Sequence, residues 1–274
     1  MPADIARKAE RLGVAKAGMD PVRLFALAVL AGAFIGLGAM AASIAWTGTA
    51  GALPFGVARV LGGLVFSLGL ILVVVGGAEL FTGNNLMVMA LAGRRITALA
   101  LLRAWAIVFA GNLVGAVGTA LLVFLGGDHF LADGAVGMTA LAIGEAKSAL
   151  PFGRAFFLGV LCNVLVCLAV WMCYGARTTT DKILAILFPV AAFVAAGFEH
   201  SVANMYFMPK ALMILWWAPA EFWSAAGATA ADFPALGIRG VVANLVPVTL
   251  GNVVGGGVFV GLVYWFIYLR RDPG

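Results

Sequence analysis

Charged residues are scarce in this sequence. Of its 274 residues, 11% are charged and 64% are hydrophobic, whereas soluble domains contain about 25% charged and about 45–50% apolar residues. Water therefore cannot be the solvent for most of the folded surface. No polar stretch is long enough to form a second, soluble core, so we expect a single membrane domain in contact with the lipid bilayer.

Cysteine and histidine are also rare. Cys162, Cys167 and Cys173 lie in one apolar segment without C-x-x-C spacing, so they predict neither a disulfide framework nor a metal site. His200 is the only histidine expected at membrane depth, and we interpret His129 as incidental. The apolar segments contain no H-E-x-x-H motif and no nucleophile–base pair. We expect no cofactor, and a membrane-embedded enzyme or haem-carrying anchor is a weak alternative.

Six apolar stretches are long enough to cross a bilayer, because about 20 helical residues span its ~30 Å of hydrocarbon. They cover residues 23–46, 60–91, 98–125, 149–174, 183–208 and 240–268. We therefore predict an all-α membrane protein with six transmembrane helices in a channel domain over residues 23–270. Residues 1–22 are polar and lack the apolar centre of a signal peptide. We expect them to form a cytoplasmic N-terminal segment, and residues 271–274 a cytoplasmic tail.

The basic residues are divided unequally between the two ends of these stretches. Twelve of the seventeen fall on one side: Arg7, Lys8, Arg11, Lys16, Arg23, Arg94, Arg95, Arg103, Arg177, Lys182, Arg270 and Arg271. The positive-inside rule places this side in the cytoplasm, so both termini are cytoplasmic in a bacterial-type inner membrane. The net charge of +5 thus indicates topology, and we expect no nucleic-acid partner.

Two of the six stretches are polar where a plain membrane helix is apolar. The second carries Glu79, Thr82 and Asn84, and the fifth carries Glu199, His200 and Asn204. A helix that unwinds in lipid frees backbone groups, which must then be satisfied inside the protein. We therefore predict that the second and fifth helices are broken.

An internal repeat links the two polar stretches. G-A-E-L-F-T-G-N-N at 77–85 and G-F-E-H-S-V-A-N-M at 197–205 share Gly, Glu and Asn at matching offsets. Downstream, the G-N-x-x-G motif of Asn112 recurs around Asn252. With three spans in each half, the halves must insert with opposite orientation, giving an inverted 3+3 repeat. Broken helices in corresponding positions indicate a substrate path at the repeat interface.

The four repeated acidic and amide residues have a structural interpretation. The carboxylates of Glu79 and Glu199 accept hydrogen bonds from freed amides, while Asn84 and Asn204 both donate and accept. We therefore interpret these four as support for the helix breaks. His200 differs, because an ionisable residue inside the membrane is costly and is by default a candidate functional residue.

At these residues the sequence resembles the formate/nitrite transporter family. The resemblance covers nearly the whole chain after residue 20, with six matching strings in the right order. They are F-S-L-G-L-I-L from Phe66, E-L-F-T-G-N-N from Glu79, K-S at Lys147, L-C-N-x-L-V-C-L-A-V-W from Leu161, G-F-E-H-S-V-A-N-M from Gly197, and N-L-V-P-V-T-L-G-N from Asn244. It implies an aquaporin-like protomer with its own pore, and five protomers in a homopentamer. The N-P-A boxes of true aquaporins are absent, which disfavours a water or glycerol channel.

The resemblance also assigns roles to individual residues. The family's polar pore residues fall on His200, Thr82, Asn163 and Asn252, and its vestibule lysine falls on Lys147. Its hydrophobic constrictions fall on five apolar residues: Phe66, Leu70, Leu80, Phe81 and Phe193. By spacing alone Phe66 and Leu70, four residues apart, are ordinary core residues on one helix face.

These residues predict a channel or transporter for a small monovalent anion, with formate favoured and nitrite or hydrosulfide as alternatives. A bare carboxylate at an apolar constriction faces a large desolvation cost, and histidine titrates near neutral pH. His200 is therefore a candidate for exchanging a proton with the anion. The segment 1–22 is either an amphipathic helix that closes the pore at low pH or an anchor.

Overall fold

The computed structural model describes residues 2–270, and every regular element in that part of the chain is helical. Five helical stretches are long and apolar enough to cross a membrane: α2 (Pro21–Trp46), α3 (Phe55–Gly76), α6 (Ala98–Leu125), α8 (Phe152–Gly175) and Ile238–Tyr268. The last comprises α12 (Ile238–Val253), the π-helical η4 (Val254–Leu262) and α13 (Val263–Tyr268). The shorter helices are α1 (Pro2–Ala17), α4 (Phe81–Asn84), η1 (Asn85–Met87), α5 (Val88–Ala92), η2 (Asp128–Phe130), α7 (Ala135–Ser148), α9 (Thr179–Ala195), α10 (Ser201–Trp217), α11 (Ala220–Ala226) and η3 (Ala230–Asp232).

The ends of these helices follow local sequence signals. The side chain of Asp20 accepts a hydrogen bond from the Arg23 amide at the start of α2, where Pro21 is the first helical residue. Thr178 and Asp181 form a reciprocal capping box at the start of α9. The sequence thus marks where α2 and α9 begin. Helix α9 continues through Pro189.

Small residues allow the long helices to pack closely. A methyl group added to Gly32 of α2 would clash with the Asn112 backbone of α6, and one added to Gly115 would clash with Val29. In the second half, Gly251 lies equally close to the Phe156 backbone of α8. Close backbone approach at glycine is the usual way in which membrane helices associate. These contacts hold α2 against α6 and α8 against α12.

The second and fifth predicted stretches each contain a non-helical link. Helix α3 ends at Gly76, and residues 77–80 run without helical structure until α4 begins at Phe81. Helix α9 ends at Ala195, and α10 begins at Ser201. Gly77 and Gly197 have φ values of 78° and 74°, a left-handed conformation that glycine adopts without steric cost. The fifth stretch continues to Trp217, nine residues beyond the expected end at 208, because Met208 and its neighbours are buried protein core.

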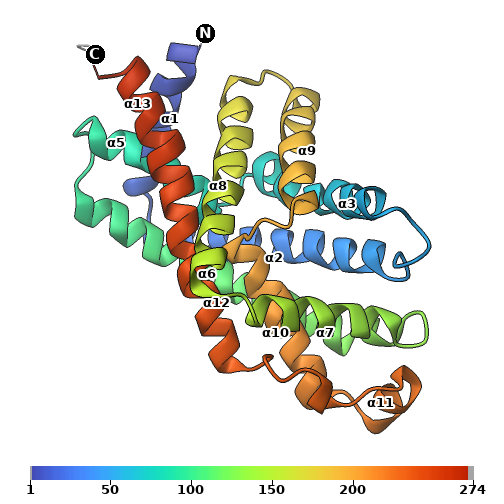
Figure 1. Ribbon diagram of the computed structural model, residues 1–274. Coiled ribbons are helices and arrows are strands. Elements are labelled where there is room, and N and C mark those ends of the chain that lie inside the picture. The colour runs from blue at the N-terminus through green and yellow to red at the C-terminus, as the bar shows by residue number, and fades with distance from the viewer. Residues whose placement is uncertain (1, 271–274) are drawn as a thin grey trace.

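The links lie in the middle of the molecule (Figure 1). Helices α8 and α9 pack side by side, as do α2 and α3, and α3 contacts α9 between the two pairs. Helix α10 packs against α6, α7 and α2. At the opposite end from α11, α1 packs against α5, α8 and α13. The two links are therefore enclosed by helices from both halves of the chain.

Candidate functional site

Thr82 and His200 bring the two links together. The Thr82 hydroxyl oxygen lies 2.9 Å from Nε2 of His200, although the residues are 118 positions apart in sequence. Their exposed fractions are 0% and 3%. Each residue lies at the start of the helix that follows its link, since α4 begins at Phe81 and His200 is the N-cap of α10.

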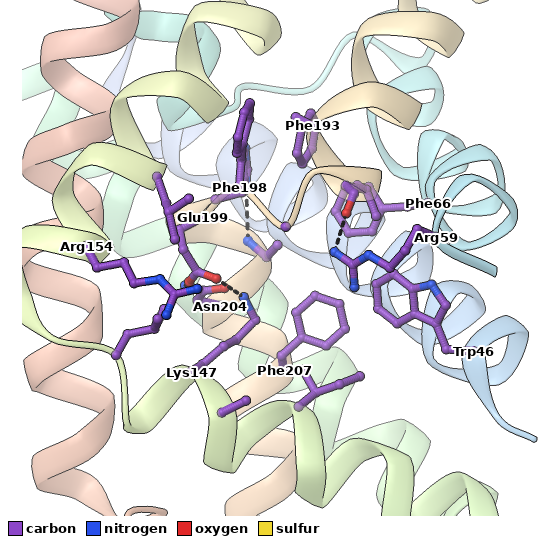
Figure 2. A pocket seen from close by; sticks show the side chains of 18 residues that line it. Trp46, Arg59, Phe66, Lys147, Arg154, Phe193, Phe198, Glu199, Asn204 and Phe207 are labelled. Atoms are coloured by element: carbon purple, nitrogen blue, oxygen red, sulfur yellow. Dashed lines mark hydrogen bonds and ion pairs between the residues drawn. The ribbon is translucent and has the colours of Figure 1, made fainter. Parts of the chain in front are cut away.

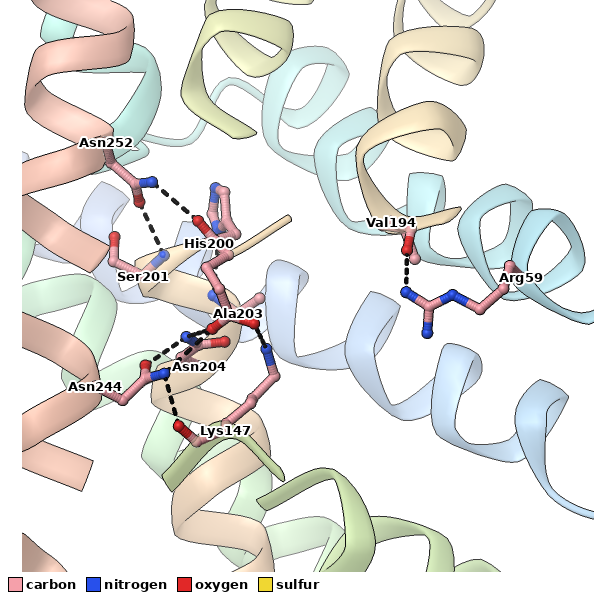
Figure 3. A network of polar contacts seen from close by, with 10 residues as sticks. Arg59, Lys147, Val194, His200, Ser201, Ala203, Asn204, Asn244 and Asn252 are labelled. Atoms are coloured by element: carbon pink, nitrogen blue, oxygen red, sulfur yellow. Dashed lines mark hydrogen bonds and ion pairs between the residues drawn. The ribbon is translucent and has the colours of Figure 1, made fainter. Parts of the chain in front are cut away.

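The hydrogen bonds of His200 specify its neutral tautomer. Nδ1 accepts a hydrogen bond of 3.0 Å from the Ala203 amide and so caps α10 (Figure 3). An accepting nitrogen carries no proton, so the neutral ring has its proton on Nε2 and donates it to the Thr82 hydroxyl. A second proton on Nδ1 would break the cap. Protonation of this ring is thus coupled to the first turn of α10.

Asn112 and Asn252 hold the two links in equivalent ways. The Asn112 side-chain oxygen accepts from the Phe81 amide at 2.8 Å, and its amide group donates to the carbonyls of Ala28 and Glu79. The Asn252 oxygen accepts from the Ser201 amide at 2.9 Å, and its amide group donates to the carbonyls of Gly159 and Glu199. Figure 3 shows the bond between Asn252 and Ser201. Both asparagines are fully buried, so each satisfies backbone groups that would otherwise be orphaned.

We expect Asn252→Ala to destabilise the protein by roughly 2–4 kcal/mol, because three buried backbone groups lose their partner. In detergent this lowers the thermal unfolding midpoint by roughly 5–10 °C. Thr249→Ala is the matched control, since Thr249 lies on the same helix and its hydroxyl oxygen has no hydrogen-bond partner among the described residues. Equal losses in the two variants would contradict the assigned role of Asn252.

Asn163 supports the site from α8. Its amide nitrogen lies 3.2 Å from the Thr82 carbonyl, 2.7 Å from the Asn252 carbonyl and 2.8 Å from Oδ1 of Asn85. The side chain is fully buried. A methyl group on Gly256 would clash with this amide, so the π-helical η4 fits closely around it. Asn163 therefore fixes the backbone beside Thr82, and no spacing pattern in the sequence predicts this contact.

A buried ion pair lies on the α7 side of His200. The Lys147 ammonium is 2.7 Å from Oε1 of Glu199, while Oε2 accepts 2.6 Å and 3.3 Å hydrogen bonds from the side-chain amides of Asn204 and Asn244. Asn244 also donates to the Lys147 carbonyl at 3.0 Å. These four residues form a network that ties α7, α10 and α12 together, as Figure 3 shows.

A matching ion pair lies beside the first link. The Lys16 ammonium is 2.9 Å from Oε2 of Glu79 and 2.6 Å from Oδ1 of Asn84. Asn84 in turn donates to Glu79 at 2.9 Å. Lys16 belongs to α1, for which the sequence analysis offered a pore-closing helix or an anchor, and Lys16 itself entered only as a topology signal. The repeat carries the missed signal, because Glu79 matches Glu199 and the Lys16–Glu79 pair is the counterpart of the Lys147–Glu199 pair.

One cavity, of about 260 Å³, opens beside Lys147 and reaches His200. Figure 2 shows its two walls, with Lys147, Glu199 and Arg154 on one side and Phe66 with Arg59 on the other. Arg59 donates to the Val194 and Ala195 carbonyls at the end of α9. The rings of Phe66 and Phe193 meet edge to face with centroids 5.8 Å apart, and the Phe193 ring stacks on His200.

A second cavity, of about 300 Å³, lies beside Lys16 and is lined by Leu70, Leu80, Glu79 and Asn84. Thr82 lines neither cavity. Its neighbours Leu80 and Gly83 line the second cavity, and its hydrogen-bond partner His200 lines the first, so Thr82 lies between the two. Of the five predicted constrictions, Phe66 and Phe193 line the first cavity, and Leu70 and Leu80 line the second. Phe81 lines neither. Its ring packs against Trp105 and Phe109 of α6.

His129 lies away from this site. Its ring stacks on Phe124 with centroids 4.7 Å apart and also contacts Phe130 and Phe222. Neither ring nitrogen has a partner among the described residues. Burial and the nearby Lys210 ammonium lower the pKa of His129. This histidine contacts neither cavity and packs as part of an aromatic cluster.

Comparison with known proteins finds channels and transporters that are similar to this chain. The formate/nitrite transporter family model matches residues 3–266. The chain is 46% identical over 273 residues to the formate channel FocA of Escherichia coli K12, covering 99% of this chain and 95% of that protein. It is 40% identical to FocA of Haemophilus influenzae, covering 95% and 92%. A solved pentameric formate channel with formate bound superposes with a TM-score of 0.84 at 43% identity, covering 91% of this chain and 98% of that one.

These relatives are channels and transporters, which confirms the resemblance read from the motifs and the expectation of a transport protein. The haem-anchor and enzyme alternatives find no counterpart among them. The match extends over nearly the full length of the chain. The protein belongs to the formate/nitrite transporter family.

Proposed function

We propose that this protein is a channel for small monovalent anions, with formate as its main substrate. The observation that carries the proposal is the His200–Thr82 hydrogen bond between two cavities, each of which holds a buried Lys–Glu pair. An anion entering either cavity meets an ammonium group before it meets an apolar constriction. The curated relatives named as formate channels support formate as the substrate.

The two halves form an inverted repeat with six membrane crossings, of which the second and fifth are broken. The equivalent bonds of Asn112 and Asn252, and the equivalent Lys16–Glu79 and Lys147–Glu199 pairs, support this arrangement. Three spans per half give the halves opposite orientations in the bilayer. The positive-inside rule then places α1 and the Lys16 cavity on the cytoplasmic side of the inner membrane.

The protein functions as a homopentamer with one pore in each protomer. The solved pentameric formate channel supports this assembly. The exposed apolar side chains of α3 and α6, such as Leu68 and Leu122, are available for lipid or for neighbouring protomers. The pore in each protomer is the path between the two cavities and not the axis of the pentamer.

Permeation requires the carboxylate to lose much of its hydration. Lys147 raises the local anion concentration at the outer mouth, and Phe66 and Phe193 exclude water beyond it. At the centre, Nε2–H of neutral His200 and the Thr82 hydroxyl are the donors that replace lost water. An imidazolium would also lend the anion its proton, so that formic acid crosses the narrowest section. That step needs a proton on Nδ1 and therefore requires the Ala203 cap to open.

The selectivity experiment uses purified protein in planar bilayers or proteoliposomes, comparing formate, nitrite, hydrosulfide and acetate at two pH values. Formate is expected to carry the largest flux, and acetate, with its extra methyl group, the smallest. A larger nitrite or hydrosulfide flux would reassign the substrate within the same family. No flux of any of these anions would refute the channel function.

A further inference from the structure

A third charged hollow lies on the surface, away from the Lys147 and Lys16 cavities. Its volume is about 550 Å³, and it lies where α1, the turn after α5 and α13 meet. Figure 1 shows these three elements side by side at one end of the molecule. The hollow is lined by Arg7, Glu10, Arg11, Val14, Ala92, Gly93, Arg94, Arg95, Trp265, Leu269 and Arg270.

The charge of this hollow is strongly unbalanced. Five arginines line it, and Glu10 is the one acidic residue of its lining. Arg7 pairs with Asp4 at 3.0 Å, and Nε of Arg95 lies 3.9 Å from the Glu10 carboxylate. No acidic group of residues 2–270 forms an ion pair with Arg11 or Arg94. Arginine guanidinium groups bind phosphate oxygens in a bidentate geometry. The unpaired charge therefore fits a phosphate-bearing anion better than a carboxylate of the protein.

Apolar side chains extend the hollow toward the bilayer. Trp265 lines it, and Phe266 and Ile267, next in sequence on α13, are 54% and 58% exposed. Helix α13 is the last turn of a membrane-crossing stretch, so its exposed face lies where acyl chains meet headgroups. A ligand with both an anionic phosphate and apolar chains matches these neighbours, whereas free phosphate uses only the arginines.

We propose that this hollow binds the headgroup of an anionic phospholipid of the inner leaflet. This lipid site takes one premise from the proposed function, namely that α1 lies on the cytoplasmic side of the membrane. Basic pockets on the cytoplasmic side of membrane helices are known to bind such headgroups. Arg7 and Arg11 project from one face of α1, and Lys16 of the same helix pairs with Glu79 in the second cavity. A bound lipid therefore holds α1 against α5 and α13 in the position that places Lys16 at the pore.

The test counts lipids bound to the purified, full-length protein in detergent by native mass spectrometry. Phosphatidylglycerol is expected to bind saturably and phosphatidylcholine not to bind. In the double variant R11Q/R94Q the affinity falls roughly 25-fold, because each basic residue near a membrane surface contributes about fivefold. Arg177→Gln is the matched control, an exposed arginine on the same side but outside the hollow.

Thermal unfolding of the same samples supplies a second measurement. Phosphatidylglycerol raises the midpoint of the wild type but not that of R11Q/R94Q, whose midpoint without lipid matches the wild type because both side chains are exposed. An equal rise with inorganic phosphate would overturn the lipid assignment in favour of a free-phosphate site. An equal loss of binding in Arg177→Gln would contradict a specific site, because the lipid would then respond to any basic residue on that surface. Formate flux is measured separately, so lost lipid binding with intact flux refutes this inference alone.

Discussion

Replacing His200 by Asn is expected to reduce formate flux at least about tenfold. Asparagine is a good N-cap, so its side-chain oxygen replaces Nδ1 in accepting the Ala203 amide, and α10 keeps its first turn. The shorter side chain does not supply the Nε2–H donor that lies 2.9 Å from Thr82. A hydrogen bond to a charged group is worth about 1.5–3 kcal/mol, which corresponds to a factor of about ten or more in rate. Formate uptake into proteoliposomes measures the change.

The same variant also tests proton exchange. If His200 lends a proton, formate flux through the wild type rises as the pH falls, and this dependence flattens in His200→Asn. His129→Phe is the control, because the ring of His129 lies among phenylalanines and makes no hydrogen bond within the described residues. The control is expected to keep the wild-type flux and pH profile. Unchanged flux and pH dependence in His200→Asn would end the proton-exchange mechanism.

The central residues were predictable because polar groups are so conspicuous in an apolar chain. Glu79, Thr82, Glu199 and His200 interrupt long hydrophobic runs, and a buried polar group must find a partner. The sequence repeat then indicated which of them correspond. The hydrogen-bond partners of these residues were less predictable. The repeat did not assign Asn112 a role, although the motif around Asn112 repeats that around Asn252. The bonds from Asn112 to the first link show why the motif occurs twice.

Other features depend on three-dimensional contacts that hydropathy does not encode. Helix α7 has little hydrophobic periodicity, and α1 is amphipathic but too polar to cross a membrane. Hydropathy therefore places neither helix against the pore, yet they supply Lys147 and Lys16. The π-helical geometry of η4 follows from packing around Asn163, where Gly256 leaves room for the amide. Such a local irregularity arises from tertiary contacts, and π-helical turns are often found at functional sites.

Replacing Lys147 by Met is expected to destabilise the protein by about 3–5 kcal/mol, because it leaves the Glu199 carboxylate buried without its cation. The Glu199 side chain is only 6% exposed, and the remaining amides of Asn204 and Asn244 do not neutralise its charge. The thermal unfolding midpoint in detergent measures the loss. Lys16→Met is expected to cost a similar amount, because the exposed fractions of the Lys16 and Glu79 side chains, 19% and 9%, are close to the 15% and 6% of Lys147 and Glu199.

The double variant K147M/E199Q separates the structural role of Lys147 from its role toward the anion. Neutral glutamine keeps the hydrogen bonds to Asn204 and removes the buried charge, so most of the stability returns. Flux does not return, because the outer cavity has lost the ammonium that concentrates anions, and the formate concentration for half-maximal flux rises. If the double variant recovers both stability and wild-type flux at low formate, then Lys147 only neutralises Glu199. If it recovers stability alone, the same lysine both holds α10 in place and captures the anion, and the buried carboxylate is what keeps that ammonium at the cavity wall.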